Sequence, residues 1–122
     1  NRHYFNAIIS QRALREIYLR GFEIAVREGK PKAIMPSYNK INGFYTSQNP
    51  GLLTTIARDE WGFDGLYVTD FDGKGSAAAK VRAGSDILMS GNMQEYNEIK
   101  RALKDRTLDE SILDKNLLHI LK

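Results

Sequence analysis

Apolar residues recur at helical spacing in two parts of the chain, which predicts two amphipathic helices. The first covers residues 10–29 and begins at Ser10, a suitable N-cap. The second covers residues 50–60 and has Pro50 at its first position, where proline is favoured. The inward stripe of the first helix comprises Leu14, Ile17, Tyr18, Gly21, Phe22, Ala25 and Val26, and that of the second comprises Leu52, Leu53, Ile56 and Ala57.

Three short apolar runs lie between turn-forming residues and predict strands. They cover residues 33–35, 65–69 and 86–89. Each run is continuous rather than alternating, which is typical of strands that are buried on both faces. Asn42 and Gly43 mark a turn between the first strand and the second helix.

Three further helices complete the expected order. They cover residues 76–83, 94–104 and 109–121, and either Thr107 or Asp109 caps the last one. The apolar stripe of the last helix comprises Ile112, Leu113, Leu117, Ile120 and Leu121. The order is therefore α-β-α-β-α-β-α-α, which predicts an α/β fold of parallel strands joined by right-handed helical crossovers.

Composition narrows the class of protein. With 122 residues, 42% of them hydrophobic and 27% charged, the chain is expected to be soluble and to form one domain. The net charge of +3 does not indicate a nucleic-acid partner, because 18 lysines and arginines are scattered among 15 acids. The absence of cysteine excludes disulfides, thiolate metal sites and a cysteine nucleophile.

No apolar run has the length of a membrane span, so we expect no membrane partner. The first residues also lack the apolar core of a signal peptide. If the parent protein is periplasmic or secreted, its signal lies outside this chain. The compartment therefore stays open.

Polar residues gather where the first two predicted strands end. The segment WGFDGLYVTDF brings Asp70 to the end of the second strand, and Ser37, Tyr38 and Asn39 follow the first. In parallel α/β folds this end of the strands carries the chemistry. Taken alone, Asp70 is more readily explained as a cap of the next helix than as a catalytic acid.

Several segments together resemble the catalytic (β/α)8 barrel of glycoside hydrolase family 3, the β-glucosidase and β-xylosidase group. The family's helix, strand and SYN-x-x-NG loop are matched by ALREIYLRGFEIAVREGKPKAIMPSYNKINGFYTSQN. The strand with its nucleophile, usually written SDW, is matched by LLTTIARDEWGFDGLYVTDF. The next unit, usually ending in MPG, resembles AAAKVRAGSDILMSGN, and the last barrel helix resembles TLDESILDKNLLHILK. The similarity covers nearly the whole chain in the right order.

The resemblance implies that residues 1–122 are one partial barrel segment, corresponding to about the last three of eight strands. Three parallel strands cannot close a barrel and leave unpaired edges. We therefore expect a fragment of a larger enzyme, or a chain that associates with another. In the family, the absent half supplies an acid and a Lys-His pair that hold the sugar, and a following domain commonly supplies the general acid/base.

The resemblance also assigns roles to residues. Asp70 is implied to be the nucleophile, and Tyr38 is suited to donate a hydrogen bond to it. Phe71 stands where the family usually has Trp, so its ring is expected to pack against the sugar; an ordinary core aromatic is the alternative. Arg2 matches an arginine near the sugar site, although a surface arginine is the plain expectation. Two departures from the usual family pattern leave the nucleophile untouched. Thr69 stands where the family usually has Ser, and Ser90 in MSG stands where it usually has Pro.

Ser37 and Asn39 are implied to belong to the loop beside the reacting sugar, together with Asn42, which a turn also explains. Asp72 lies close enough to Asp70 to be the second carboxyl group of a catalytic pair. Both acids would then lie on the same side of the sugar, so we do not assign Asp72 this role. We expect Asp72 to cap the following helix or to bind a peripheral hydroxyl. His3 and His119 are isolated in the sequence, so neither a metal site nor a cofactor is predicted.

The leading expectation is part of a retaining, exo-acting β-glycosidase that removes terminal non-reducing β-D-glycosyl residues through a glycosyl-enzyme on Asp70. The isolated chain is expected to be inactive. A non-catalytic sugar-binding or assembly module derived from such a barrel is the alternative. A weaker alternative is phosphate binding by the glycine-rich loop 73–76, because the full P-loop spacing is absent. The residues do not indicate whether the sugar is glucose, xylose or galactose. The chain resembles the aminosugar-cleaving branch of the family less well.

Overall fold

The computed structural model describes all of residues 1–122 and confirms the helix expected over residues 10–29. It is one helical rod made of α1 (Gln11–Ala13), η1 (Leu14–Tyr18), α2 (Arg20–Ile24) and η2 (Ala25–Gly29). Ser10 caps it by accepting a hydrogen bond from the Ala13 amide, and Lys30, with a left-handed φ of 46°, ends it.

The inward stripe predicted for this rod is only partly correct. Leu14 and Val26 are buried, but Ile17, Tyr18 and Phe22 are exposed. The 3.6-residue period identifies an apolar face but not what covers it, and no other element of this chain covers these three side chains.

The second predicted helix is confirmed as η4 (Gly51–Glu60). The Asn49 side chain accepts a hydrogen bond from the Leu52 amide at 3.1 Å, and Pro50 already has helical torsions, as expected for a first helical residue. The helix buries Leu53, Ile56 and Ala57. The largest core cluster comprises Val26, Leu53, Ala57, Phe63, Tyr67 and Ala83.

Three parallel segments of the chain lie side by side next to η4. The strand β2 (Ala33–Ile34) pairs with β5 (Leu66–Tyr67), and Val68 forms a parallel bridge with Ile87. The third predicted strand is thus reduced to a single bridge. Backbone hydrogen bonds run from the Ile87 amide to the Tyr67 carbonyl at 3.0 Å and from the Thr69 amide to the Ile87 carbonyl at 2.9 Å. Side chains extend this short pairing, because the Asp86 carboxylate accepts from the Tyr67 amide and the Met89 amide donates to the Thr69 hydroxyl.

A second, small sheet was not predicted. It contains β1 (Asn6–Ala7), β3 (Lys40–Ile41) and β4 (Phe44–Tyr45) in the order β1-β3-β4, followed by the short helix η3 (Thr46–Gln48). Strands of two residues are too short to leave an alternating pattern in the sequence. The predicted turn at Asn42 and Gly43 joins β3 to β4, with φ of 50° and 91° as a tight hairpin requires.

The C-terminal helices are α3 (Ala77–Ala83), α4 (Met93–Lys104) and α5 (Glu110–Ile120). Their N-caps are Ser76, Asn92 and Asp109, so Asp109 rather than Thr107 caps the last helix. The stripe predicted for α5 is wrong at Leu117, Ile120 and Leu121, which are exposed. The residue of α5 that is buried is Asn116, whose amide donates to the Val81 and Ser85 carbonyls at 2.9 and 3.2 Å.

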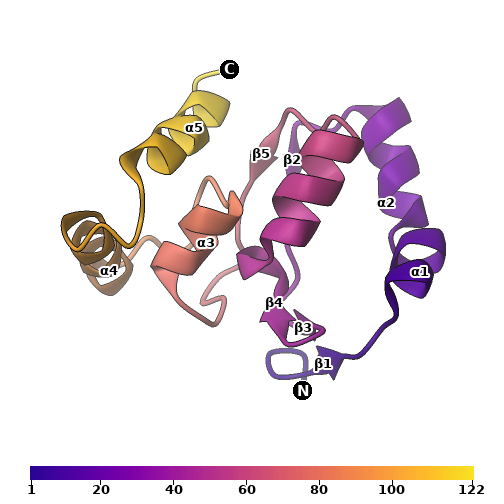
Figure 1. The fold of residues 1–122 in the computed structure, drawn as a ribbon, viewed down its shortest axis with the longest axis horizontal. Coiled ribbons are helices and arrows are strands. Elements are labelled where there is room, and N and C mark those ends of the chain that lie inside the picture. Colours follow the sequence, from indigo (N-terminus) through magenta and orange to yellow (C-terminus); the bar gives the residue numbers. More distant parts are fainter.

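The elements follow one another along a curved row (Figure 1). The rod of α1 and α2 lies at one end, η4 with β2 and β5 lies in the middle, and α3, α4 and α5 continue to the other end. The small sheet lies beside the N-terminus. The chain therefore has the mixed α/β architecture that was expected. None of its helices is both long and apolar enough to cross a bilayer.

Candidate active site

Asp70 stands at the carboxyl end of the three parallel segments. The residue before it, Thr69, is buried and ties the neighbouring segment in place. Its amide donates to the Ile87 carbonyl, and its hydroxyl accepts from the Met89 amide, both at 2.9 Å. Asp70 itself is half-buried. The position is therefore fixed by the fold while the carboxylate still reaches the surface.

Asp70 and Phe71, the two residues at this strand end, are held by hydrogen bonds that involve the backbone of Phe71. Oδ1 of Asp70 accepts from the Phe71 amide at 2.7 Å, and the Phe71 carbonyl accepts from the Tyr38 hydroxyl at 2.8 Å. The Phe71 ring is 58% exposed, so it is not part of the core of this chain. An aromatic face is thus presented next to a carboxylate.

Tyr38 joins this strand end to the N-terminus. The Arg2 guanidinium carbon lies 5.2 Å from the centroid of the Tyr38 ring, and the His3 ring lies 4.2 Å from it. Desolvation, followed by the influence of the nearby Asp70 carboxylate, raises the pKa of Tyr38, and Arg2 opposes this shift. The tyrosine is therefore a neutral donor at ordinary pH. In this structure its hydroxyl donates to Phe71, beside the carboxylate that it was expected to serve.

Ser37 and Asn39 both have local structural partners. The Ser37 hydroxyl donates to the Thr46 hydroxyl at 3.3 Å, and Thr46 in turn donates to the Ser37 carbonyl. The Asn39 amide donates to the Lys40 carbonyl at 3.0 Å. These contacts order the loop that holds Tyr38.

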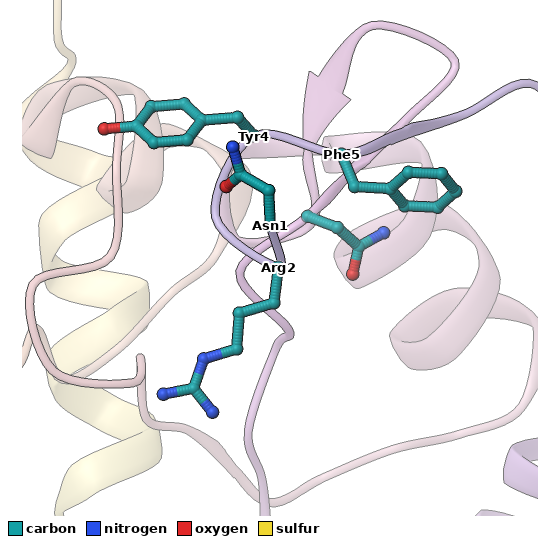
Figure 2. Close-up of a pocket in the computed structure, with 5 residues that line it drawn as sticks. Asn1, Arg2, Tyr4 and Phe5 are labelled. Carbon is teal, nitrogen blue, oxygen red and sulfur yellow. The ribbon is translucent and has the colours of Figure 1, made fainter.

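A hollow of about 570 Å³ adjoins this group. Its lining residues are Asn1, Arg2, Tyr4, Phe5 and Asn39. Figure 2 shows Tyr4 and Phe5 pointing to opposite sides, with the Arg2 side chain extending away from both. Arg2 and Asn39 are thus brought to one surface, and Arg2 connects that surface to Tyr38.

Asp72 does not cap the following helix, contrary to expectation. The Ser76 hydroxyl does so, by accepting from the Ala79 amide at 3.2 Å. Asp72 instead has a left-handed φ of 52° in the turn after Asp70. It also acts electrostatically on Tyr38 in the same sense as Asp70, so the two acids share this surface.

The glycine-rich loop does not suit a phosphate. A Cβ at Gly75 would lie 1.9 Å from Nε2 of Gln48, so the space beside the loop is already filled. The Glu98 carboxylate accepts from the Ser76 hydroxyl and from the Ala78 amide at the start of α3. A fixed carboxylate there repels an anion.

Sequence reasoning missed two buried charged groups. Lys80 pairs with Glu95 below the loop that follows Asp70. Asp86 pairs with Arg58 and with His119, so this histidine is a structural partner of a buried acid. No local pattern announces either group, because the partners lie 15 to 33 residues apart. No three or more His, Asp or Glu side chains gather in a way that would hold a metal ion.

Known proteins match the chain over almost its whole length. The family model described as the glycosyl hydrolase family 3 N terminal domain matches residues 2–122. A β-glucosidase of Rhizobium radiobacter is 47% identical over 80% of the chain, and one of Ruminococcus albus is 41% identical over 99%. β-Glucosidase 3B of Thermotoga neapolitana, solved in complex with glycerol, is 43% identical and superposes over 99% of the chain with a TM-score of 0.93.

The chain is much shorter than these proteins. It spans 12% and 14% of the two relatives and 18% of the Thermotoga neapolitana structure. The match to the family model nevertheless covers all but one residue of the chain. This chain belongs to glycoside hydrolase family 3.

Proposed function

We propose that this chain is the part of a retaining, exo-acting β-glucosidase that carries the catalytic nucleophile, Asp70. It would form about three strands of a (β/α)8 barrel whose other strands and acid/base come from further chain or from another subunit. The observation that carries the proposal is the half-buried Asp70 carboxylate at the carboxyl end of three parallel segments, beside Tyr38 and Arg2, in a family 3 chain. The relatives that match it are named β-glucosidases.

The chemistry proceeds in two displacements. An oxygen of Asp70 attacks the anomeric carbon and forms an ester bond, while the bond from that carbon to the leaving oxygen breaks. An acid outside this chain, whose carboxyl group lies about 5–5.5 Å from that of Asp70, gives its proton to the leaving oxygen. Water then attacks the anomeric carbon, gives up its proton to the same outside group, and frees Asp70. The configuration of the sugar is retained.

The neighbouring side chains are proposed to bind the sugar. Phe71 offers its exposed ring to the apolar face of the sugar. Arg2 and Asn39, which line one hollow, offer hydrogen bonds to hydroxyl groups, and Ser37 adds its hydroxyl at the edge of the same loop. Tyr38 remains neutral beside the nucleophile and donates a hydrogen bond to its strand end, which preorganises the carboxylate.

The decisive experiment replaces Asp70 with asparagine in the intact protein that carries residues 1–122. Hydrolysis of an aryl β-glucoside is expected to fall by several decades, since a nucleophile cannot be spared. A 2-deoxy-2-fluoroglucoside with a good leaving group should add the mass of one sugar to the wild-type peptide containing Asp70, because deglycosylation becomes slow. Asp59→Asn, at an exposed acid of η4 that is not part of this surface, is the control, and it should keep both hydrolysis and labelling.

Two results would overturn the proposal. One is an Asp70→Asn protein that hydrolyses aryl β-glucosides at the wild-type rate. The other is a label on a different residue. An intact protein that binds glucosides but neither hydrolyses them nor takes the label would instead be the non-catalytic sugar-binding module. The length of the parent reading frame supplies the first check, since it shows whether the rest of the barrel comes from the same chain or must come from another subunit.

A further inference from the structure

A buried lysine lies under the loop that follows Asp70. Lys80, in α3, is only 1% exposed. Its ammonium donates to the Gly73 carbonyl at 2.7 Å and to Oε1 of Glu95 at 3.1 Å. Burial of an ion pair is a weak source of stability, because desolvation offsets most of the attraction. The position of the charge beneath this loop therefore needs another explanation.

Glu95 holds the ammonium in place. It lies in the first turn of α4 and its side chain is largely buried. Its second oxygen, Oε2, is buried without a hydrogen-bond partner. Lys80 is thus the side chain that compensates this carboxylate, and the attraction fixes the lysine between α4 and the loop.

The loop is anchored on both sides of Asp72. Upstream, the Phe71 carbonyl accepts from Tyr38. Downstream, the Gly73 carbonyl accepts from Lys80, while the Gly73 amide approaches the Asp70 carbonyl at 3.4 Å. Asp72 between them has a left-handed φ of 52°, a conformation that a residue with a side chain adopts only when its surroundings hold it. The lysine therefore supplies one of the two contacts that fix this turn.

We propose that Lys80 is a positioning residue for Asp70, with Glu95 as its anchor. The inference rests on the proposed role of Asp70 as nucleophile. By holding the Gly73 carbonyl, Lys80 fixes the turn that begins at Asp70 and so fixes the direction of the carboxylate. Its hydrogen bonds go to Gly73 and Glu95, not to the Asp70 carboxylate or to the surface that would bind sugar. Its loss should lower kcat and leave KM nearly unchanged.

The test separates the hydrogen bond to the loop from the buried charge. Three variants of the intact protein are compared: Lys80→Met, Glu95→Gln and the double variant. Lys80→Met leaves the buried Glu95 carboxylate without its cation and should lower the melting temperature. The double variant removes both charges and should recover most of that loss. The double variant should still have a kcat about 10- to 100-fold below wild type, since small misplacements of a reacting group have effects of this size. Glu95→Gln keeps the donor to Gly73 but removes the charge that anchors it, so its kcat should lie between those of wild type and the double variant.

Hydrogen exchange gives a readout that does not depend on catalysis. In the double variant the amides of residues 71–75 should exchange faster, while those of α3 and α4 should not. A double variant with the wild-type kcat, or with unchanged exchange in the loop, would overturn the positioning role. A wild-type protein that takes no label on Asp70 would overturn the proposed function, and loop exchange would then still show whether Lys80 anchors the turn.

Discussion

Asp86 is a buried acid held by three partners. Its carboxylate is fully buried, accepts from the Tyr67 amide at 2.7 Å and from Nη2 of Arg58 at 2.8 Å, and pairs with Nδ1 of His119 at 2.8 Å. The three partners come from β5, η4 and α5. A buried carboxylate is stable only when donors replace its water. Asp86 therefore joins the middle of the molecule to its C-terminal helix.

Replacing Asp86 with alanine should destabilise the protein strongly. The change leaves the Arg58 charge, which is itself largely buried, without a partner. A loss of about 3–5 kcal/mol is expected, the range for breaking one side of a buried pair. Urea unfolding measures it. Asp59, which is exposed and lies on the same helix as Arg58, is the control. Asp59→Ala should change the free energy of unfolding by no more than about 0.5 kcal/mol. Equal effects of the two changes would contradict this account.

The candidate site was predictable only through resemblance. The strand-end position of Asp70 was readable from the sequence, but its chemical role was not, because a cap and a nucleophile look alike in one sequence. Lys80 was not predicted at all. An alanine-rich helix gives no sign that its lysine is buried, since burial depends on Gly73 and on Glu95 in the next helix.

At the scale of elements, signals within a few residues were the reliable ones. The cap Ser10 and the turn at Asn42 were predicted because each acts on its immediate neighbours. The strand at Ile87 was overestimated, because its backbone pairing with β5 is limited to one bridge and side chains from more distant residues supply the hydrogen bonds beyond it. The exposed face of α2 was missed because periodicity identifies an apolar face but not what covers it.

The contact between α3 and α4 should weaken in acid. Desolvation opposes the shift, but hydrogen bonds from Ser76 and from the amides of Ala77 and Ala78 lower the pKa of Glu98 below its ordinary 4.5. A carboxyl with a lowered pKa stabilises the fold fully above its unfolded pKa, and this contribution disappears as the pH falls through the folded pKa. Wild type should therefore exceed Glu98→Gln in stability at neutral pH.

The difference between wild type and Glu98→Gln should shrink as the pH is lowered from about 5 toward 3. Urea unfolding at a series of pH values measures the two curves. Glu110→Gln, which removes an exposed carboxyl at the start of α5, controls for the loss of one acid. Parallel curves for wild type and Glu98→Gln would show that Glu98 is not ionised more readily in the fold.

At the scale of the whole molecule, apolar surface is left open at one end. Tyr18 and Phe22 on the rod are 60% and 59% exposed, and Met35, which lines the same hollow as Phe22, is also exposed. Within this chain β2 pairs only with β5, and the segment at Ile87 only with Val68, so both margins of the parallel group are unpaired. Exposed apolar patches and open strand edges favour association. Both features are expected of a barrel segment separated from its neighbours.

The 122-residue chain on its own should therefore self-associate and show no hydrolysis of aryl β-glucosides. Light scattering after size exclusion should give a mass that rises with concentration. Replacing Tyr18 and Phe22 together with serine should reduce the association, because it removes apolar surface without touching the core. Arg12→Ser, a change of similar exposure on the same rod, should not. A concentrated chain that stays monomeric would contradict the open surface, and a monomer that hydrolyses glucosides would contradict the need for further barrel strands.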